Sequence, residues 1–188
     1  MGRGGERLIG KHMTTQQKLA ELSARVQVLE DEAAIRRLMA DMMEKADDRK
    51  FPQWGERMAS FYTDDGQWTS GAGFADVGMA ERGRAALVKK FTAGTRIAES
   101  SHLLGTESIE VKGDGANGTW LCFEPVTLNT ASGAKEAVWI MGRYICEFRR
   151  DGGRWRVRTV RYDGIFCTPY EKGWTKERFM SIRPLATK

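Results

Sequence analysis

Length, composition and charge already exclude several classes of protein. The chain has 188 residues, of which 41% are hydrophobic and 29% charged, a balance typical of one folded domain and not of a disordered chain. No segment approaches the roughly 20 apolar residues of a membrane span, and the first residues lack the continuous apolar core of a signal peptide. We therefore expect a cytoplasmic protein without a membrane partner.

The basic charge, +5 with a pI near 9.2, does not by itself predict nucleic-acid binding. Arg3, Arg7 and Lys11 contribute part of it near the N-terminus, and the rest is spread along a chain rich in both signs. A nucleic-acid surface needs a concentrated basic face or a recognisable module. The densest basic run, residues 149–158, is more simply interpreted as a hairpin with solvated arginines.

The cysteines and histidines argue against a disulfide framework and a metal site. Cys122, Cys146 and Cys167 are scattered, odd in number and form no CxxC pair, which favours a reducing compartment. Only His12 and His102 are available as imidazole ligands. We expect no bound metal.

The N-terminus predicts an extension followed by one domain. His12-Met13 resembles the scar of a common cloning site, and Met13 is a plausible native start. We therefore expect residues 1–12 to be a tag or a disordered extension. Residues 13–188 are expected to form a single domain with an N-terminal helical arm and a C-terminal tail.

Helical periodicity dominates the first half of the chain. Apolar residues recur at steps of 3 and 4 from about residue 14 to 47, which predicts a long helix, with a kink or break near residues 31–34. Its first part carries a short apolar seam, too short for a coiled coil, that should pack on the domain or on a neighbouring subunit. Two further helices are expected, one after Pro52 and one at about 83–92, with a Gly-rich loop at 71–83 before the latter.

Alternating patterns in the second half predict strands separated by turn residues. The expected strands are 67–70, 102–111, 118–129, 136–149 and 154–166, with turns at 112–115, 130–134 and 151–153. Helices followed by an antiparallel meander predict an α+β fold with the helices on one face of the sheet. The sequence contains no P-loop, no paired-glycine nucleotide fingerprint, no GxSxG and no HExxH.

Two residues could carry acid–base chemistry. On a helical wheel Asp47 lies within about 40° of Met43, so it can extend the apolar face of the long helix toward the interior. His102 begins a strand on the face of Leu104, and histidine is the usual proton acceptor near neutral pH. From these residues alone, a solvated helix end and a structural histidine remain open as alternatives.

An ordered series of segments resembles a known family. The segments are Ile35–Leu38, Asp47, Phe61–Trp68, His102–Thr106, Gly142–Tyr144 and Phe148–Trp155, and together they resemble the SnoaL-like family. That family belongs to the nuclear-transport-factor-2-like superfamily of cone-shaped α+β barrels and includes dehydratases and a dehydrochlorinase. The resemblance implies a strongly curved, mostly antiparallel sheet closed on one side by helices.

The resemblance also implies a function for Asp47 and His102. They would form a dyad that abstracts a proton from a hydrophobic, aromatic small molecule without a cofactor. Water, halide or a small carbonyl fragment such as formaldehyde would then leave. The resemblance further implies a homo-oligomer, a trimer before a dimer. Isomerases and cyclases occur on related sheets.

The chain departs from the family at one point of the expected site. Dehydratase relatives often carry a tyrosine about one turn before the aspartate, where this chain has Met42 and Met43. The acid must then come from elsewhere, and the candidates for it are Tyr62, Tyr144, Tyr162, Arg143 and Arg161. The candidates for substrate binding are Tyr62, Trp68, Glu124, Trp139, Tyr144 and Arg161. Two other functions remain open: a non-catalytic ligand-binding or assembly module, and the small subunit of a ring-hydroxylating dioxygenase.

Overall fold

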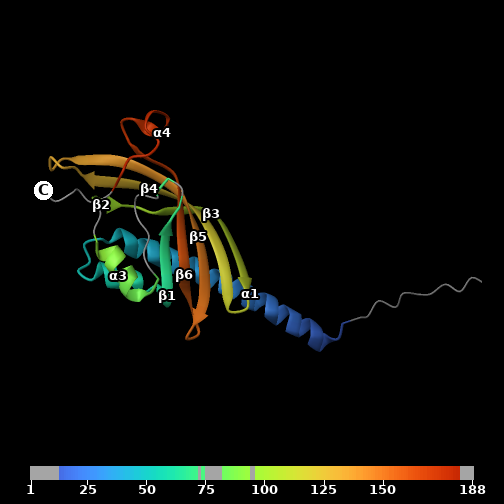
Figure 1. Ribbon diagram of the computed structural model, residues 1–188. Helices are drawn as coiled ribbons and strands as arrows, with labels where there is room; N and C mark the ends of the chain where they lie inside the picture. Colours follow the sequence, from blue (N-terminus) through green and yellow to red (C-terminus); the bar gives the residue numbers. More distant parts are fainter. Residues whose placement is uncertain (1–12, 72, 75–81, 94–95, 183–188) are drawn as a thin grey trace, which may run out of the picture.

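The computed structural model describes residues 13–71, 73–74, 82–93 and 96–182 (Figure 1). The expected extension at 1–12 and most of the Gly-rich loop at 71–83 lie outside these residues. The helices are α1 (Thr15–Asp47), α2 (Trp54–Ala59), α3 (Arg84–Thr92) and α4 (Gly173–Lys176). The strands are β1 (Tyr62–Ser70), β2 (Ile97–Ser100), β3 (Leu103–Lys112), β4 (Gly115–Asn129), β5 (Lys135–Asp151) and β6 (Arg154–Pro169).

The strands form one strongly curled sheet, a half-barrel that wraps around the helices (Figure 1). Its order is β1-β6-β5-β4-β2, and β3 also pairs with β4, so that β2 and β3 share one edge. Strand β1 runs parallel to β6, and the other neighbouring pairs are antiparallel. The predicted α+β class and the mostly antiparallel curved sheet are confirmed.

The observed elements differ most from the predicted ones at β1 and β2, and the other strands differ by up to three residues at an end. Strand β1 begins at Tyr62, five residues before the predicted start, and already pairs there with Val157 of β6. Strand β2 was not predicted; it is only four residues long and pairs with the far end of β4. No described helix is long and apolar enough to cross a membrane.

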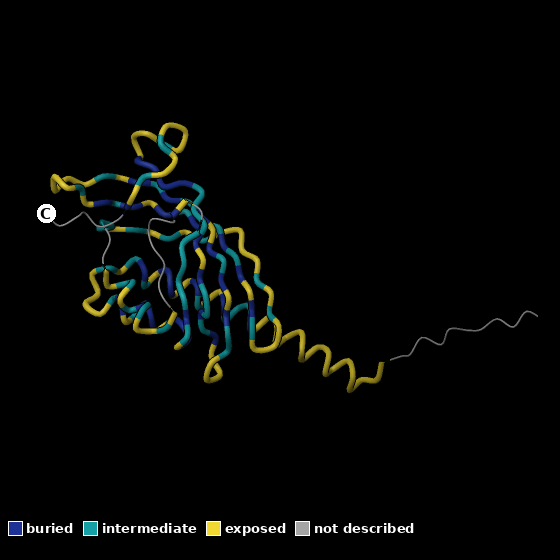
Figure 2. Tube along the Cα trace, in the orientation of Figure 1, coloured by how far each residue is buried: buried dark blue, intermediate teal, exposed yellow. Residues whose placement is uncertain are grey.

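Helix α1 is a single unbroken helix of 33 residues. Thr14 forms a capping box with Gln17, in which each side chain bonds the other residue's backbone N–H. The predicted break near 31–34 is absent. Figure 2 shows that the N-terminal half is exposed along its length. Four apolar side chains lie along this half and form what we call the α1 seam: Leu19, Leu22, Val26 and Leu29.

A buried aspartate marks the point where α1 reaches the sheet. Asp31 is 6% exposed, and its Oδ1 accepts hydrogen bonds from Arg150 (2.6 Å) and from the indole of Trp155 (3.0 Å). Burial acts to raise the pKa of Asp31, but these hydrogen bonds outweigh it and the pKa is lowered. From Ile35 onward α1 buries an apolar face against the sheet. Asp31 therefore anchors the helix at the entrance to the core.

Two bulges in β6 decide which of its side chains face the helices. Val157 pairs with Phe148 and Thr159 with Glu147, so Arg158 is an extra residue on β6. Gly164 pairs with Gly142 and Phe166 with Met141, so Ile165 is a second extra residue. Each bulge exchanges the inward and outward positions of the strand beyond it.

Candidate active site

Asp47 and His102 are joined by a short hydrogen bond. The Oδ1 atom of Asp47 lies 2.7 Å from Nδ1 of His102, and Oδ2 accepts the backbone N–H of the same histidine at 2.9 Å. Asp47 is the last residue of α1, and His102 lies directly before β3. The imidazole side chain is 6% exposed and the carboxylate 26%. The end of the helix thus fixes both the backbone and the ring of the histidine.

Ser100 and Arg49 extend this pair into a chain of polar contacts. Ser100 donates its hydroxyl to Oδ1 of Asp47 at 2.7 Å, and Nε of Arg49 donates to the Ser100 hydroxyl at 3.4 Å. The guanidinium of Arg49 lies over the ring of Trp54, 4.9 Å from its centroid. Sequence reasoning missed Arg49 and Ser100, because only the fold brings residues 47–49 to strand β2.

A second carboxylate approaches the other side of the imidazole. Oε1 of Glu124 lies 3.4 Å from Nε2 of His102, and the Glu124 side chain is 8% exposed. His102 therefore lies between two carboxylates, one at each ring nitrogen. The sequence placed Glu124 among the site candidates, and the structure brings it to the dyad.

The electrostatics of the dyad follow from burial and these charges. Burial acts to lower the pKa of His102, but the carboxylates of Glu124 and Asp47 outweigh it, and the pKa is raised. Burial acts to raise the pKa of Asp47, whereas the hydrogen bonds from His102 lower it, and the pKa falls below its ordinary value. Burial lowers the pKa of Arg49. The pair favours an ionised aspartate beside a more basic imidazole.

A cavity of about 540 Å³ lies between α1 and strands β3 and β4. Asp47 and His102 form part of its wall. The volume of the cavity is within the size range of small-molecule sites. Its apolar lining comes from Met39, Ala40, Met43, Leu104 and Trp120, and its polar lining includes Arg36, Glu44 and Glu107. Arg36 forms an ion pair with Glu107, which also accepts the indole N–H of Trp120 at 3.3 Å.

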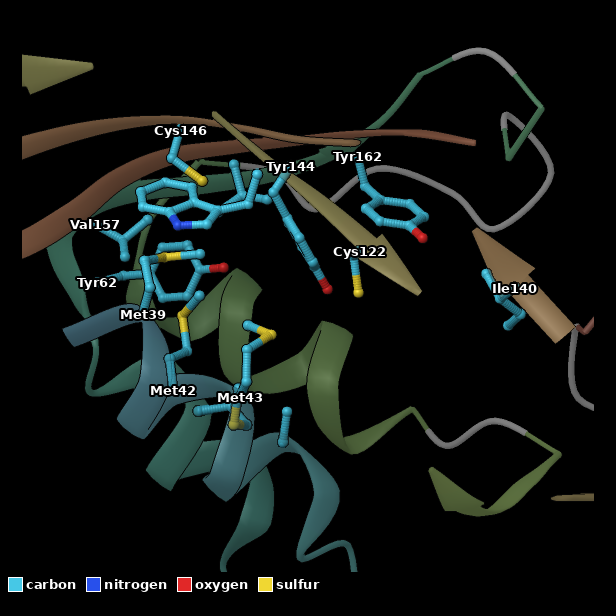
Figure 3. Close-up of a cluster of buried hydrophobic side chains, with 14 of the residues drawn as sticks. Met39, Met42, Met43, Tyr62, Cys122, Ile140, Tyr144, Cys146, Val157 and Tyr162 are labelled. Carbon is cyan, nitrogen blue, oxygen red and sulfur yellow. The ribbon is translucent and has the colours of Figure 1, made fainter. Parts of the chain in front are cut away.

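Two of the predicted tyrosines lie inside the half-barrel. Tyr62 is 1% exposed and Tyr144 is 8% exposed, and burial raises the pKa of both phenols well above the ordinary value. Figure 3 shows Tyr144 and Cys122 pointing from the sheet toward the helices, on the side of Met43. The thiol of Cys122 is free and buried, and burial raises its pKa. Tyr144 is therefore on the same face as Glu124.

Trp68 is partly buried and packs against the core from β1. The ammonium of Lys90, on α3, lies 4.6 Å from the centroid of its ring. Trp68 is thus placed between the sheet and α3 and does not line the 540 Å³ cavity beside the dyad.

The structure places Trp139 and Arg161 away from the dyad, which corrects two expectations. Trp139 is on the opposite face of β5 from Ile140 and packs against Phe123, Tyr170 and Trp174. Arg161 has a side chain that is 57% exposed and donates to Asp163 at 2.9 Å. The bulge at residue 158 causes this outward position, because it reverses the alternation expected from the start of β6.

Comparison with known proteins agrees with this architecture. The profile of the SnoaL-like domain matches residues 27–161. The chain belongs to the SnoaL-like family. Among curated proteins, none matches its sequence at a significant level.

Several solved structures share this fold. An NTF2-like protein with a cystatin-like fold from Novosphingobium aromaticivorans is 24% identical, with 78% of this chain and 90% of that chain covered and a TM-score of 0.58. A putative scytalone dehydratase from the same organism is 18% identical, with 85% and 96% covered and a TM-score of 0.64. A type 3 hexachlorocyclohexane dehydrochlorinase from Novosphingobium barchaimii is 23% identical, with 77% and 93% covered and a TM-score of 0.62. At these identities the likeness concerns the fold.

Proposed function

We propose that the protein is a cofactor-independent lyase that removes a proton from a hydrophobic, aromatic small molecule. The observation that carries the proposal is the 2.7 Å contact between Asp47 and Nδ1 of His102, on the wall of a largely apolar cavity. An aspartate bonded to one ring nitrogen fixes the tautomer and leaves the lone pair on the other nitrogen, as a general base requires. The dehydratase- and dehydrochlorinase-like names of the structural neighbours support the same class of reaction.

The reaction follows from the protonation of the ring. Neutral His102 takes a proton from a carbon of the substrate at Nε2, and Asp47 stabilises the imidazolium that forms. For loss of water or halide, the electron pair of the broken C–H bond forms the new double bond, and the C–O or C–halogen bond breaks with its electron pair going to the leaving group, which also takes up a proton when it is hydroxide. For loss of formaldehyde, His102 instead takes the O–H proton of a hydroxymethyl group, the O–H electron pair forms the C=O bond of formaldehyde, and the electron pair of the broken C–C bond passes into a carbonyl conjugated with the aromatic ring. Glu124, 3.4 Å from Nε2, is placed to receive or return a proton near the leaving group.

Proton abstraction can be tested before the natural substrate is known. A panel of aromatic compounds with β-hydroxyl, β-halogen or hydroxymethyl groups is incubated with the protein in D₂O, and mass spectrometry records both elimination products and deuterium exchange. Asp48→Asn is the matched control for Asp47→Asn, because Asp48 is the neighbouring residue, has a side chain 53% exposed and pairs with Arg57. We expect exchange or elimination with the wild type and Asp48→Asn, a loss of about 10²–10⁴-fold in His102→Gln, and a strong loss in Asp47→Asn as well.

Two outcomes would contradict the proposal. Full turnover by folded His102→Gln would remove the general base. Binding of the panel with neither exchange nor elimination would favour the alternative, a non-catalytic ligand-binding or assembly module of the same fold.

A further inference from the structure

The N-terminal half of α1 extends past the sheet and leaves an apolar stripe uncovered. We call residues 15–30 the α1 arm. The four side chains of the α1 seam lie along it, and each is between 51% and 65% exposed. They recur at steps of three, four and three residues, the period of about 3.5 that is typical of helices packed side by side. The family profile begins at residue 27, so the seam lies largely outside the SnoaL-like domain.

The α1 seam points away from the domain to which α1 belongs. At about 100° per residue, the centre of the seam lies about 150° around the helix from the centre of the face that α1 buries, between Asp31 and Ala46. Figure 1 shows the arm extending beyond the edge of the sheet. Cover for the seam must therefore come from outside the part of the chain that the structure describes.

Charged residues on the two flanks of the seam match a second copy of the arm. Arg25 lies on one flank and Glu30 on the other; both are exposed, and neither forms an ion pair within the described residues. In two parallel helices in register, a residue on one flank faces the residue five positions later in the partner. Arg25 of each arm would then face Glu30 of the other. In antiparallel arms with the same apolar layers, the two Arg25 side chains would meet.

The charge of the arm does not suit a membrane surface. Helices that lie on membranes carry an excess of Lys and Arg on their polar face. In and beside the α1 arm, Glu21, Glu30 and Glu32 outnumber Lys18 and Arg25. The polar face therefore favours a protein partner of mixed charge over an anionic lipid surface.

We propose that the α1 arm binds the same arm of a second copy of this chain, in parallel and in register. The α1 seam supplies the apolar contact, and the two pairs of Arg25 with Glu30 set the orientation. A free peptide of about 15 residues is only a marginal helix in water. Here the buried half of α1, anchored by Asp31, already holds the helix in place. The arms therefore meet as preformed helices, and the expected product is a concentration-dependent dimer with the two domains on opposite sides of the paired arms.

Cysteine cross-linking tests the register. Leu22→Cys places a thiol in the seam, where a parallel, in-register pair brings residue 22 of both copies together; the native thiols of Cys122, Cys146 and Cys167 are buried. We expect mild oxidation to give a covalent dimer on a non-reducing gel. Ala24→Cys is the matched control, because residue 24 is also exposed but lies on the opposite side of the helix, and it should stay monomeric. No covalent dimer from Leu22→Cys, or an equal yield from both variants, would overturn the inference.

Charge reversal tests the pairing without changing the seam. Arg25→Glu replaces two attractive pairs by two repulsive ones, so it should raise the dissociation constant measured by sedimentation about three- to tenfold. Adding Glu30→Arg to Arg25→Glu should restore most of the affinity, because the two charges are then exchanged. Lys18→Glu is the control: it makes the same change in net charge but faces Ser23 in the parallel pair, and should change the constant less than about twofold.

Three sedimentation results would overturn the inference. One is a wild type that stays monomeric up to about 200 µM, and binding of that monomer to phosphatidylglycerol vesicles would assign the seam to a membrane instead. Another is an oligomer unaffected by Arg25→Glu, which another surface would hold together. The third is weakening by Lys18→Glu but not by Arg25→Glu, which would mean antiparallel arms with Lys18 opposite Glu32. None of these measurements requires turnover, so they test the arm independently of the proposed lyase.

Discussion

Asp31 provides the sharpest test of how α1 is held against the sheet. Asp31→Ala removes the acceptor of one charged hydrogen bond from Arg150 and one from the buried indole N–H of Trp155. Hydrogen bonds to charged groups contribute about 1.5–3 kcal/mol each, and they are not fully additive, so we expect a loss of about 3 kcal/mol. For a chain of this length, that corresponds to a melting temperature lower by about 6–12 °C.

Asp114→Ala is the matched control, because Asp114 pairs with the same arginine at 3.1 Å but has a side chain that is 82% exposed. An exposed ion pair contributes about 0–1 kcal/mol. Urea unfolding followed by circular dichroism gives the free energy of unfolding of both variants, which are compared with the same dependence on urea concentration. If Asp31→Ala and Asp114→Ala differ by less than about 0.5 kcal/mol, the reasoning about the buried anchor is refuted.

Three further predictions concern the Asp47–His102 dyad, Gly142 and the α1 seam. The stability contributed by Asp47 and His102 should be largest between pH 3.8 and 6.5. It should fall on the acid side, through the lowered pKa of Asp47, and on the alkaline side, through the raised pKa of His102. The difference in free energy of unfolding between the wild type and Asp47→Asn, obtained from urea titrations at several pH values, measures this contribution. Gly142→Ala should destabilise by about 1–3 kcal/mol, whereas Gly105→Ala, which has no atom within 4 Å of the added Cβ, should not; thermal melts that rank them equally would contradict this. Light scattering should show a homo-oligomer, and Leu22→Glu should weaken it because Leu22 lies in the exposed α1 seam. A monomeric wild type would contradict this prediction.

The pH dependence of activity gives an independent check on His102. Only the neutral imidazole can accept a proton, so kcat/KM should rise with pH through the raised pKa of His102 and level off above it. Glu124→Gln removes one of the two charges that raise this pKa, so the rise should move to lower pH. A profile that falls across this range would mean that the cationic ring is the active form.

Local periodicity in the sequence was sufficient to predict the α+β class. It also placed Asp47 on the buried face of α1 and His102 near the start of a strand, but only the family resemblance joined the two residues as a dyad. Strict alternation along β5 also separates Trp139 from Tyr144, so the outward position of the tryptophan was within reach of the pattern.

Other positions depend on features that no periodic pattern contains. Arg161 faces outward because one extra residue at position 158 reverses the alternation of β6. Arg49 follows the end of α1, and its bond to Ser100 joins residues 51 positions apart. This contact forms only because β2 lies beside the end of α1. The four residues of β2 are too few to show a periodic pattern from which that position could be predicted.

The charges around His102 constrain both the substrate and the working state of the site. Asp47 and Glu124 supply two carboxylates, and Arg49 supplies one guanidinium within electrostatic reach of both. With a protonated His102 these four groups sum to no net charge, and with the neutral ring required of a base they carry one negative charge. The reactive form therefore repels an anionic substrate and accepts a neutral one. When the substrate's proton reaches Nε2, the net charge of the four groups returns to zero.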